Sequence, residues 1–184
     1  DVFLDAKALH RRANTRGGKV IQQWRLDDGQ QTLVLAARRG RLPECVYWGA
    51  ALPHGENLEA LLAANALDVT GGMLDENADL SLCPEASRSF PGQPGLILRD
   101  TDSTPLLPTF CFAEAREDGT GLHLMYRDDD ARIGLTFSFN ADVETHVITC
   151  ETTLNADRPM HLDWLAAPVL PAPQLSDEMI DVSG

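Results

Sequence analysis

Residues 109–155, TFCFAEAREDGTGLHLMYRDDDARIGLTFSFNADVETHVITCETTLN, decide the fold that the sequence predicts. The stretch contains runs rich in β-branched and aromatic residues, at 109–117, 121–128, 131–140 and 143–155. Asp118-Gly119 separates the first two runs, and an Asp-Gly pair in this position is a strong hairpin signal. Asp128-Asp129-Asp130 and Ala141-Asp142 separate the others. From Val143 onward the side chains alternate between two faces, as they do along a strand. The stretch therefore predicts antiparallel strands joined by tight turns.

The same pattern extends outward in both directions. VIQQWRL (20–26) and QTLVLAAR (31–38) flank Asp27-Asp28-Gly29, and a turn at Arg39-Gly40 leads into LPECVYWG (42–49). These runs predict a three-strand meander. Downstream, MHLDWLAAPVL (160–170) reads as a further strand.

One helix is predicted between the two meanders. LEALLAAN (58–65) is rich in leucine and alanine, with Asn57 as a plausible N-cap and Asn65 as a plausible end. Residues 66–108, rich in Gly, Pro, Asp and Ser, read as one long irregular loop. With about eight to ten short strands and no βαβ pattern, the sequence predicts an all-β fold, an antiparallel β-sandwich or barrel.

Charge and composition exclude several classes of partner. The chain has 184 residues and a net charge of −13, which would repel a phosphate backbone, so no nucleic acid partner is expected. The apolar runs are short and broken, and the N-terminus does not resemble a secretory signal, so no membrane span is expected. The cysteines sit in or beside apolar runs without zinc-ligand spacing, at Cys45, Cys83, Cys111 and Cys150. Reduced, buried thiols and a cytoplasmic location are expected, although an even count leaves disulfides open.

No motif for catalysis or metal binding stands out. The histidines are scattered singly, and His161 with Asp163 makes only two ligands, too few for a metal site. The acidic segment 75–79 lacks the glycine and the terminal glutamate of a calcium loop, so a solvated turn is the better interpretation. No cofactor and no metal are predicted.

Val46-Tyr47-Trp48-Gly49 ends a predicted strand with two adjacent aromatic residues. Because neighbours on a strand point to opposite faces, Tyr47 and Trp48 cannot both face one core. An aromatic residue pushed outward at a strand end can stack on the apolar face of a sugar. From spacing alone, Trp48 could equally fill a gap between sheets or domains.

Three segments carry a family resemblance, WRLDDGQQTLVLA, LPECVYWGAALP and LDENADLSLCPEASRSFPGQPGL. In this order they resemble the N-terminal domain of bacterial α-galactosidases of glycoside hydrolase family 36, over residues 20–184. The resemblance implies a galactose-mutarotase-like β-supersandwich over 20–175. It leaves 1–19 as a tail or edge segment and makes 176–184 the start of a linker to a catalytic (β/α)₈ barrel.

The resemblance also implies how work is divided in the parent enzyme. Family members release terminal α-galactose with retention through two aspartates of the barrel, beyond residue 184, so no catalytic residue is expected here and the chain alone should be inactive. Its partners would be its own barrel, a galactoside and further copies in a homo-oligomer. Trp48 matches an aromatic that walls the sugar pocket, with Tyr47 beside it as a weaker candidate. The loop 50–55 would travel with Trp48, and the loop 83–95 would lie at a barrel or subunit contact.

Two other classes stay open at this stage. One is a stand-alone carbohydrate-binding or adaptor module of sandwich fold. The other is an aldose-epimerase-like enzyme, which needs a histidine facing a carboxylate in the cleft of the sandwich. His123 or His146, with Glu144 or Glu151, are the residues to consider for it.

Overall fold

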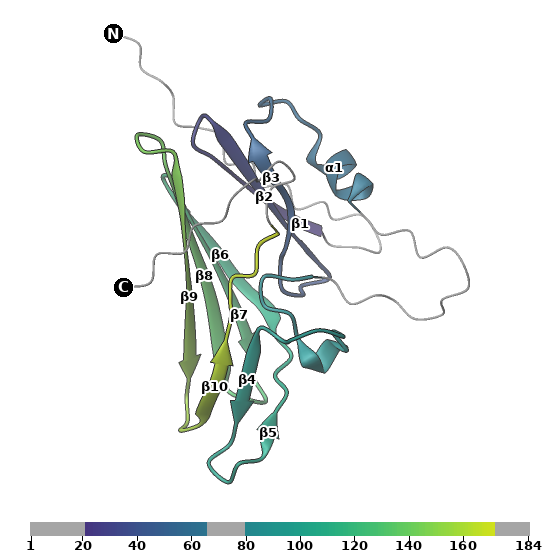
Figure 1. Cartoon of the computed structure of the whole chain (residues 1–184), viewed down its shortest axis with the longest axis vertical. Coiled ribbons are helices and arrows are strands. Elements are labelled where there is room, and N and C mark those ends of the chain that lie inside the picture. Colours follow the sequence, from purple (N-terminus) through teal and green to yellow (C-terminus); the bar gives the residue numbers. More distant parts are fainter. Residues whose placement is uncertain (1–20, 66–79, 172–184) are drawn as a thin grey trace, which may run out of the picture.

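The computed structural model describes residues 21–65 and 80–171, and its strands form three antiparallel sheets (Figure 1). Sheet A contains β1 (Ile21–Asp27), β2 (Gln31–Arg38) and β3 (Glu44–Ala50) in chain order. The predicted hairpin is present, with Asp27 paired to Thr32 and Gly29 at a φ of 91° in the turn. The first meander is therefore confirmed. The predicted tail 1–19, the linker 176–184 and the acidic segment 75–79 lie outside the described residues.

Sheet C is the larger meander, in the order β6-β7-β8-β9. Its strands are β6 (Cys111–Asp118), β7 (Gly121–Asp128), β8 (Ile133–Asp142) and β9 (Val147–Ala156). The prediction that a strand begins at Val143 was wrong, because residues 143–146 form a turn. The Asp142 carboxylate accepts hydrogen bonds from the N–H groups of Glu144 and Thr145, at 2.8 and 3.2 Å, and these bonds hold the turn.

Sheet B was not predicted as a sheet. It consists of β4 (Leu96–Arg99), β5 (Pro105–Leu106) and β10 (His161–Leu165), in the order β10-β4-β5. Residues 66–108 are therefore not uniformly irregular, and they also hold a short 3-10 helix, η1 (Ala86–Arg88). Strand β4 has only four residues and pairs with a strand more than 60 residues later, so no local signal marks it.

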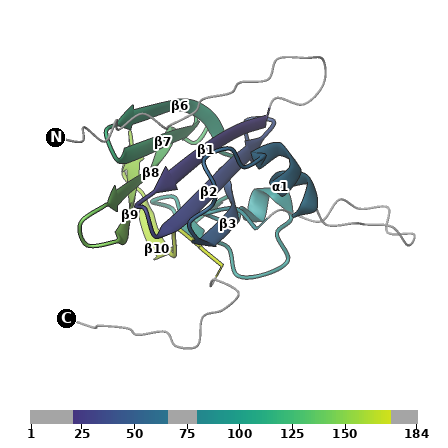
Figure 2. The same ribbon diagram turned by 90° about the horizontal axis from the view of Figure 1, so that it is seen from above.

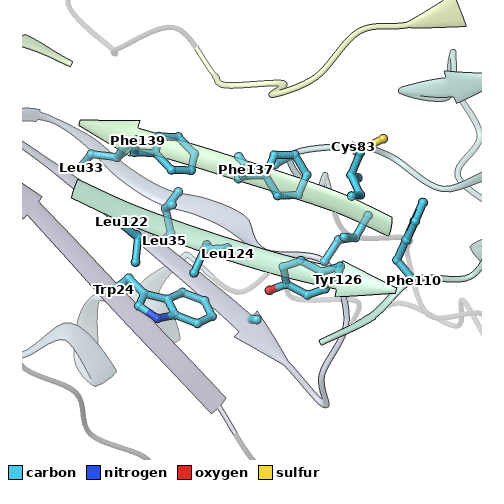
Figure 3. Packing of buried hydrophobic residues seen from close by; sticks show 14 of the residues in the cluster. Trp24, Leu33, Leu35, Cys83, Phe110, Leu122, Leu124, Tyr126, Phe137 and Phe139 are labelled. Carbon is cyan, nitrogen blue, oxygen red and sulfur yellow. The ribbon is translucent and has the colours of Figure 1, made fainter. Parts of the chain in front are cut away.

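The core lies between sheets A and C, which face each other across one apolar layer (Figure 2). Inward residues of β7 and β8 are almost fully buried: Leu122, Leu124, Tyr126, Ile133, Leu135, Phe137 and Phe139. An aromatic row crosses this layer from Trp24 through Phe112 and Tyr126 to Phe137, with ring centroids 6.1, 5.6 and 6.2 Å apart. Figure 3 shows Trp24, Tyr126 and Phe137 among the buried side chains of this layer. The expected all-β antiparallel sandwich is confirmed.

The one α-helix, α1 (Leu58–Ala64), covers the outer face of sheet A. It begins at Asn57, whose side chain accepts from the N–H groups of Glu59 and Ala60, and its C-cap is Asn65, as predicted. Leu62 packs with Val34 and Val46 in a second, smaller cluster. None of the described helices is long and apolar enough to cross a bilayer.

The cysteines only partly follow the prediction of buried thiols. All four are free, and Cys83 is buried while Cys45 and Cys150 are partly buried against the main core. Cys111 is exposed, because it opens the edge strand β6 with its side chain away from the core. For Cys111 the prediction was wrong.

Candidate functional site

Trp48 lies near the end of β3, on the face of sheet A that meets the core. It pairs with Leu33 of β2, which is buried, and its indole packs against the main cluster while remaining partly exposed. The side chain is therefore neither a free surface group nor a sealed core residue. It stands at the rim of the sandwich, where one part of the ring is packed and another meets solvent.

The indole N–H of Trp48 is held by a side chain of the neighbouring strand. It donates to Oε1 of Gln31 at 3.0 Å. The Gln31 amide nitrogen donates in turn to Oδ2 of Asp28 at 2.7 Å and to the backbone carbonyl of His146 at 2.8 Å. Since the polar edge of the indole is satisfied, its orientation is set before any ligand arrives.

Asp28 is the centre of this network and is only 2% exposed. Its Oδ1 accepts from the backbone N–H groups of Gln30 and Gln31, both at 2.8 Å. Burial raises the pKa of Asp28, but the hydrogen bonds from Gln31 and Gln30 outweigh it, so the pKa lies below its ordinary value. A buried, ionised carboxylate thus fixes the turn between β1 and β2.

The turn between β8 and β9 meets the turn between β1 and β2 at this rim. The His146 ring nitrogen Nδ1 lies 3.1 Å from the carbonyl oxygen of Asp28 and 3.9 Å from its Oδ1. His146 also has a φ of 56°, a left-handed conformation that a tight turn requires. Two turns from opposite sheets are therefore tied together beside Trp48.

The loop that follows Trp48 is anchored as well. The Arg25 guanidinium donates to the carbonyl oxygens of Pro53 and Leu52, at 2.9 and 2.7 Å, and pairs with Asp27 at 2.6 Å. The Leu52 N–H donates to the hydroxyl of Thr32 at 3.0 Å. These bonds hold residues 52–53 of the predicted loop against β1 and β2.

Tyr47 lies on the opposite face of sheet A from Trp48, as strand geometry requires. It packs against the small cluster beneath α1, and its hydroxyl donates to the carbonyl oxygen of Ala50 at 2.7 Å. The structure thus does not bring the two predicted sugar-binding side chains together. For Tyr47 a role at a pocket that Trp48 lines stays a prediction.

The structure does not place either histidine proposed for an epimerase opposite Glu144 or Glu151 inside the sandwich. His123 lies on the outer face of sheet C, with Nδ1 2.9 Å from the Ser138 hydroxyl and Nε2 3.7 Å from Asp118. Ser138 of β8 pairs with His123 of β7 on one side and with Glu151 of β9 on the other, so Ser138 stands between His123 and Glu151. His146 belongs to the network around Asp28, and Glu144 lies exposed in the turn before it.

Asp163 and the turn residue Asp128 are both engaged by protein groups and not arranged as metal ligands. Asp163 is engaged by Arg99 through two hydrogen bonds of 2.5 and 2.7 Å rather than by His161. Asp128 accepts from the N–H groups of Thr109 and Ala131, at 2.6 and 2.8 Å, as a turn residue does. Over residues 21–65 and 80–171, no group of three or more ligand side chains is assembled.

The loop 83–95 is held by a buried carboxylate that sequence reasoning did not single out. Oε1 of Glu85 accepts from the Phe110 N–H at 2.8 Å, and its Oε2 pairs with Arg88 at 2.9 Å. Burial raises the pKa of Glu85, and these partners only partly oppose the rise. Gly95 closes the loop through its N–H, which donates to the carbonyl oxygen of Pro84 at 2.9 Å.

Fold and rim together define the class of this chain as an all-β sandwich domain with a pre-oriented tryptophan at one end. The chain belongs to the glycosyl hydrolase family 36 N-terminal domain family, whose model matches residues 41–184. No curated protein matches the chain.

Solved structures similar to the chain agree in fold. The α-galactosidase AgaB of Geobacillus stearothermophilus has a TM-score of 0.58 and 14% identity, over 86% of this chain and 24% of that one. An AgaA variant from the same organism, in complex with 1-deoxygalactonojirimycin, has a TM-score of 0.57 and 16% identity, over 73% of this chain and 22% of that one. Another AgaA variant, in complex with raffinose, has a TM-score of 0.58 and 15% identity, over 75% of this chain and 22% of that one. The chain thus spans about a quarter of the length of these enzymes.

Proposed function

We propose that this chain is the non-catalytic N-terminal domain of a retaining α-galactosidase. The two carboxylates that such a reaction needs would be supplied by a (β/α)₈ barrel outside this chain. The single observation that carries the proposal is the family match over residues 41–184. The likeness in fold to domains of α-galactosidases supports it.

The part of this domain that would meet the substrate is Trp48. Its indole N–H is occupied by Gln31, so the group left to a ligand is the apolar ring. A sugar ring presents C–H groups on one face, and stacking on an indole buries that face without taking up its hydroxyls. Trp48 would thus wall one side of the galactose pocket and keep water from it.

The network behind Trp48 would keep this wall rigid. Gln31, Asp28 and His146 join the turns of two sheets, and movement of the indole would break its bond to Gln31, which Asp28 and the His146 carbonyl oxygen hold in place. Pre-orientation of this kind lowers the entropy lost on binding. We also propose that the parent enzyme is cytoplasmic and forms a homo-oligomer. Light scattering of the purified protein measures the oligomeric state.

The test is kinetic and uses the parent polypeptide with three variants at one position. Trp48→Phe keeps an aromatic face and loses the bond to Gln31, Trp48→Leu keeps apolar packing without the aromatic face, and Trp48→Ala loses both. We expect Trp48→Leu to raise KM for an aryl α-galactoside with a small change in Tm, and Trp48→Phe to retain most activity. Unchanged kinetics in Trp48→Leu with a large fall in Tm for Trp48→Ala would assign Trp48 to packing alone. The 184-residue chain by itself is expected to show no turnover.

A further inference from the structure

His146 has one ring nitrogen that is bonded and one that is not. Nδ1 lies 3.1 Å from the carbonyl oxygen of Asp28, and 36% of the side chain is exposed. Within the described part of the chain, Nε2 has no hydrogen-bond partner, and it is not among the buried atoms that lack one. The imidazole therefore leaves one polar atom open to solvent.

The bonded nitrogen decides which chemistry the open one offers. A carbonyl oxygen can only accept, so Nδ1 carries the hydrogen of its bond to Asp28. The Asp28 carboxylate, whose Oδ1 lies 3.9 Å from Nδ1, favours the same tautomer. In the neutral ring Nε2 is then an acceptor, and a hydroxyl group is a donor that it can take.

This acceptor stands beside Trp48 at the rim of the sandwich. Gln31 joins the two residues, because its Oε1 accepts from the indole N–H at 3.0 Å and its amide nitrogen donates to the His146 carbonyl oxygen at 2.8 Å. Figure 1 shows the turn between β8 and β9, which contains His146, at the same end of the molecule as the turn between β1 and β2. An apolar ring and a hydrogen-bond acceptor thus occur together, and a sugar offers a C–H face and hydroxyls to such a pair.

We infer that His146 is a second sugar-contacting residue, whose Nε2 accepts a hydrogen bond from a hydroxyl of the galactose unit that stacks on Trp48. The inference rests on the proposed function and deepens it. An indole face accepts any pyranose with an apolar side, whereas an acceptor in a fixed position distinguishes sugars by where their hydroxyls point. The position of His146 is fixed by its φ of 56° and by the bond from Nδ1, so the residue determines specificity and takes no part in bond cleavage.

His146→Asn separates the two ring nitrogens. An asparagine amide reaches the position of Nδ1, can donate to the Asp28 carbonyl oxygen, and tolerates the left-handed backbone. It has no atom at the position of Nε2. His146→Ala removes both groups, and Glu144→Gln changes an exposed side chain of the same turn as a control.

Calorimetry of D-galactose binding to the parent polypeptide tests the inference without relying on turnover. His146→Asn should weaken binding by about two- to tenfold, the range that one neutral hydrogen bond contributes, with Tm unchanged. His146→Ala should weaken binding and also lower Tm, and Glu144→Gln should change neither. Galactose derivatives that each lack one hydroxyl locate the contact. One of them should bind equally well to the wild type and to His146→Asn, because it lacks the hydroxyl that Nε2 accepts from.

Three results overturn the inference. Galactose affinity could be the same in the wild type and in His146→Asn. Every deoxygenated derivative could lose affinity in His146→Asn by the same factor as galactose, which would mean that Nε2 touches no hydroxyl. His146→Asn could lower Tm as much as His146→Ala, which would assign His146 to the turn alone.

Activity of the parent distinguishes this inference from the proposed function. A parent that hydrolyses α-galactosides and gives any of these three results keeps the proposed function and loses only the role of His146. A parent that hydrolyses none, while one galactose hydroxyl depends on His146, loses the proposed function alone. A parent that neither binds galactose nor hydrolyses galactosides loses both.

Discussion

Removing the Asp28 carboxylate should destabilise the sandwich more than any exposed acidic substitution. Asp28→Ala leaves the N–H groups of Gln30 and Gln31 and the Gln31 amide without the acceptor they share. Hydrogen bonds to a charged group contribute about 1.5–3 kcal/mol each, and water entering the turn would recover part of three such bonds. We therefore expect a loss of about 3 kcal/mol, which for a chain of this size lowers Tm by about 6–12 °C.

Asp28→Asn separates the charge from the shape. An asparagine oxygen can still accept from both backbone N–H groups, while its amide nitrogen faces that of Gln31, so a loss of about 1 kcal/mol is expected. The pKa of Asp28 is lowered in the folded protein, so its contribution is present above the ordinary value and is lost as the pH falls through the folded value. The wild type should thus lose its advantage over Asp28→Asn below about pH 4.

Urea denaturation followed by circular dichroism measures both effects, with Asp130→Ala as a control in an exposed turn. Trp48 should also report them, since its indole is bonded to Gln31, and its fluorescence should change in Asp28→Ala. If Asp28→Ala and Asp130→Ala gave the same midpoint at pH 7, the network would contribute nothing and the reasoning would fail.

Two further predictions concern the core and the loop packed beside it. Gly95→Ala should lower Tm sharply, because an added Cβ would lie 2.8 Å from the Cys83 sulfur and 2.9 Å from the Cys83 Cα. Gly55→Ala is the control and should leave Tm unchanged, because the space around Gly55 is open. Equal melting curves for the two variants would contradict this prediction. A thiol reagent at pH 8 should label the exposed Cys111 quickly. The other three cysteines should react only after unfolding, because burial raises the pKa of Cys45 and Cys83 to about 12 and that of Cys150 to about 11. Rapid labelling of more than one thiol in the folded chain would count against the packing of the core.

Local signals in the sequence predicted the elements that depend on them. The Asp-Gly hairpins and the capped helix from Asn57 to Asn65 need only neighbouring residues, and all are present. The alternation from Val143 misled because period two alone does not distinguish a strand from a polar turn. Asp142, which accepts from two following N–H groups, is the turn signal that would have corrected it.

Long-range pairing explains what sequence reasoning missed. Strand β4 is defined by its partner β10, and the Trp48 rim by contacts between Gln31 and His146, 115 residues apart. The sequence predicted Trp48 at a strand end and Tyr47 on the other face of the strand. In the structure Trp48 packs against the main core and Tyr47 against the small cluster on the opposite face of sheet A. It marked Asp28 only as part of a turn, because burial of a carboxylate depends on an element from the other sheet.

A crystal structure of the parent polypeptide with a galactose-like inhibitor tests the central claim most directly. The account predicts the indole of Trp48 within about 4 Å of the sugar, in van der Waals contact with its apolar face, and both catalytic carboxylates outside residues 1–184. The account would be contradicted if the sugar were bound and Trp48 lined none of the active sites of the assembly. A catalytic carboxylate within this chain would contradict it as well.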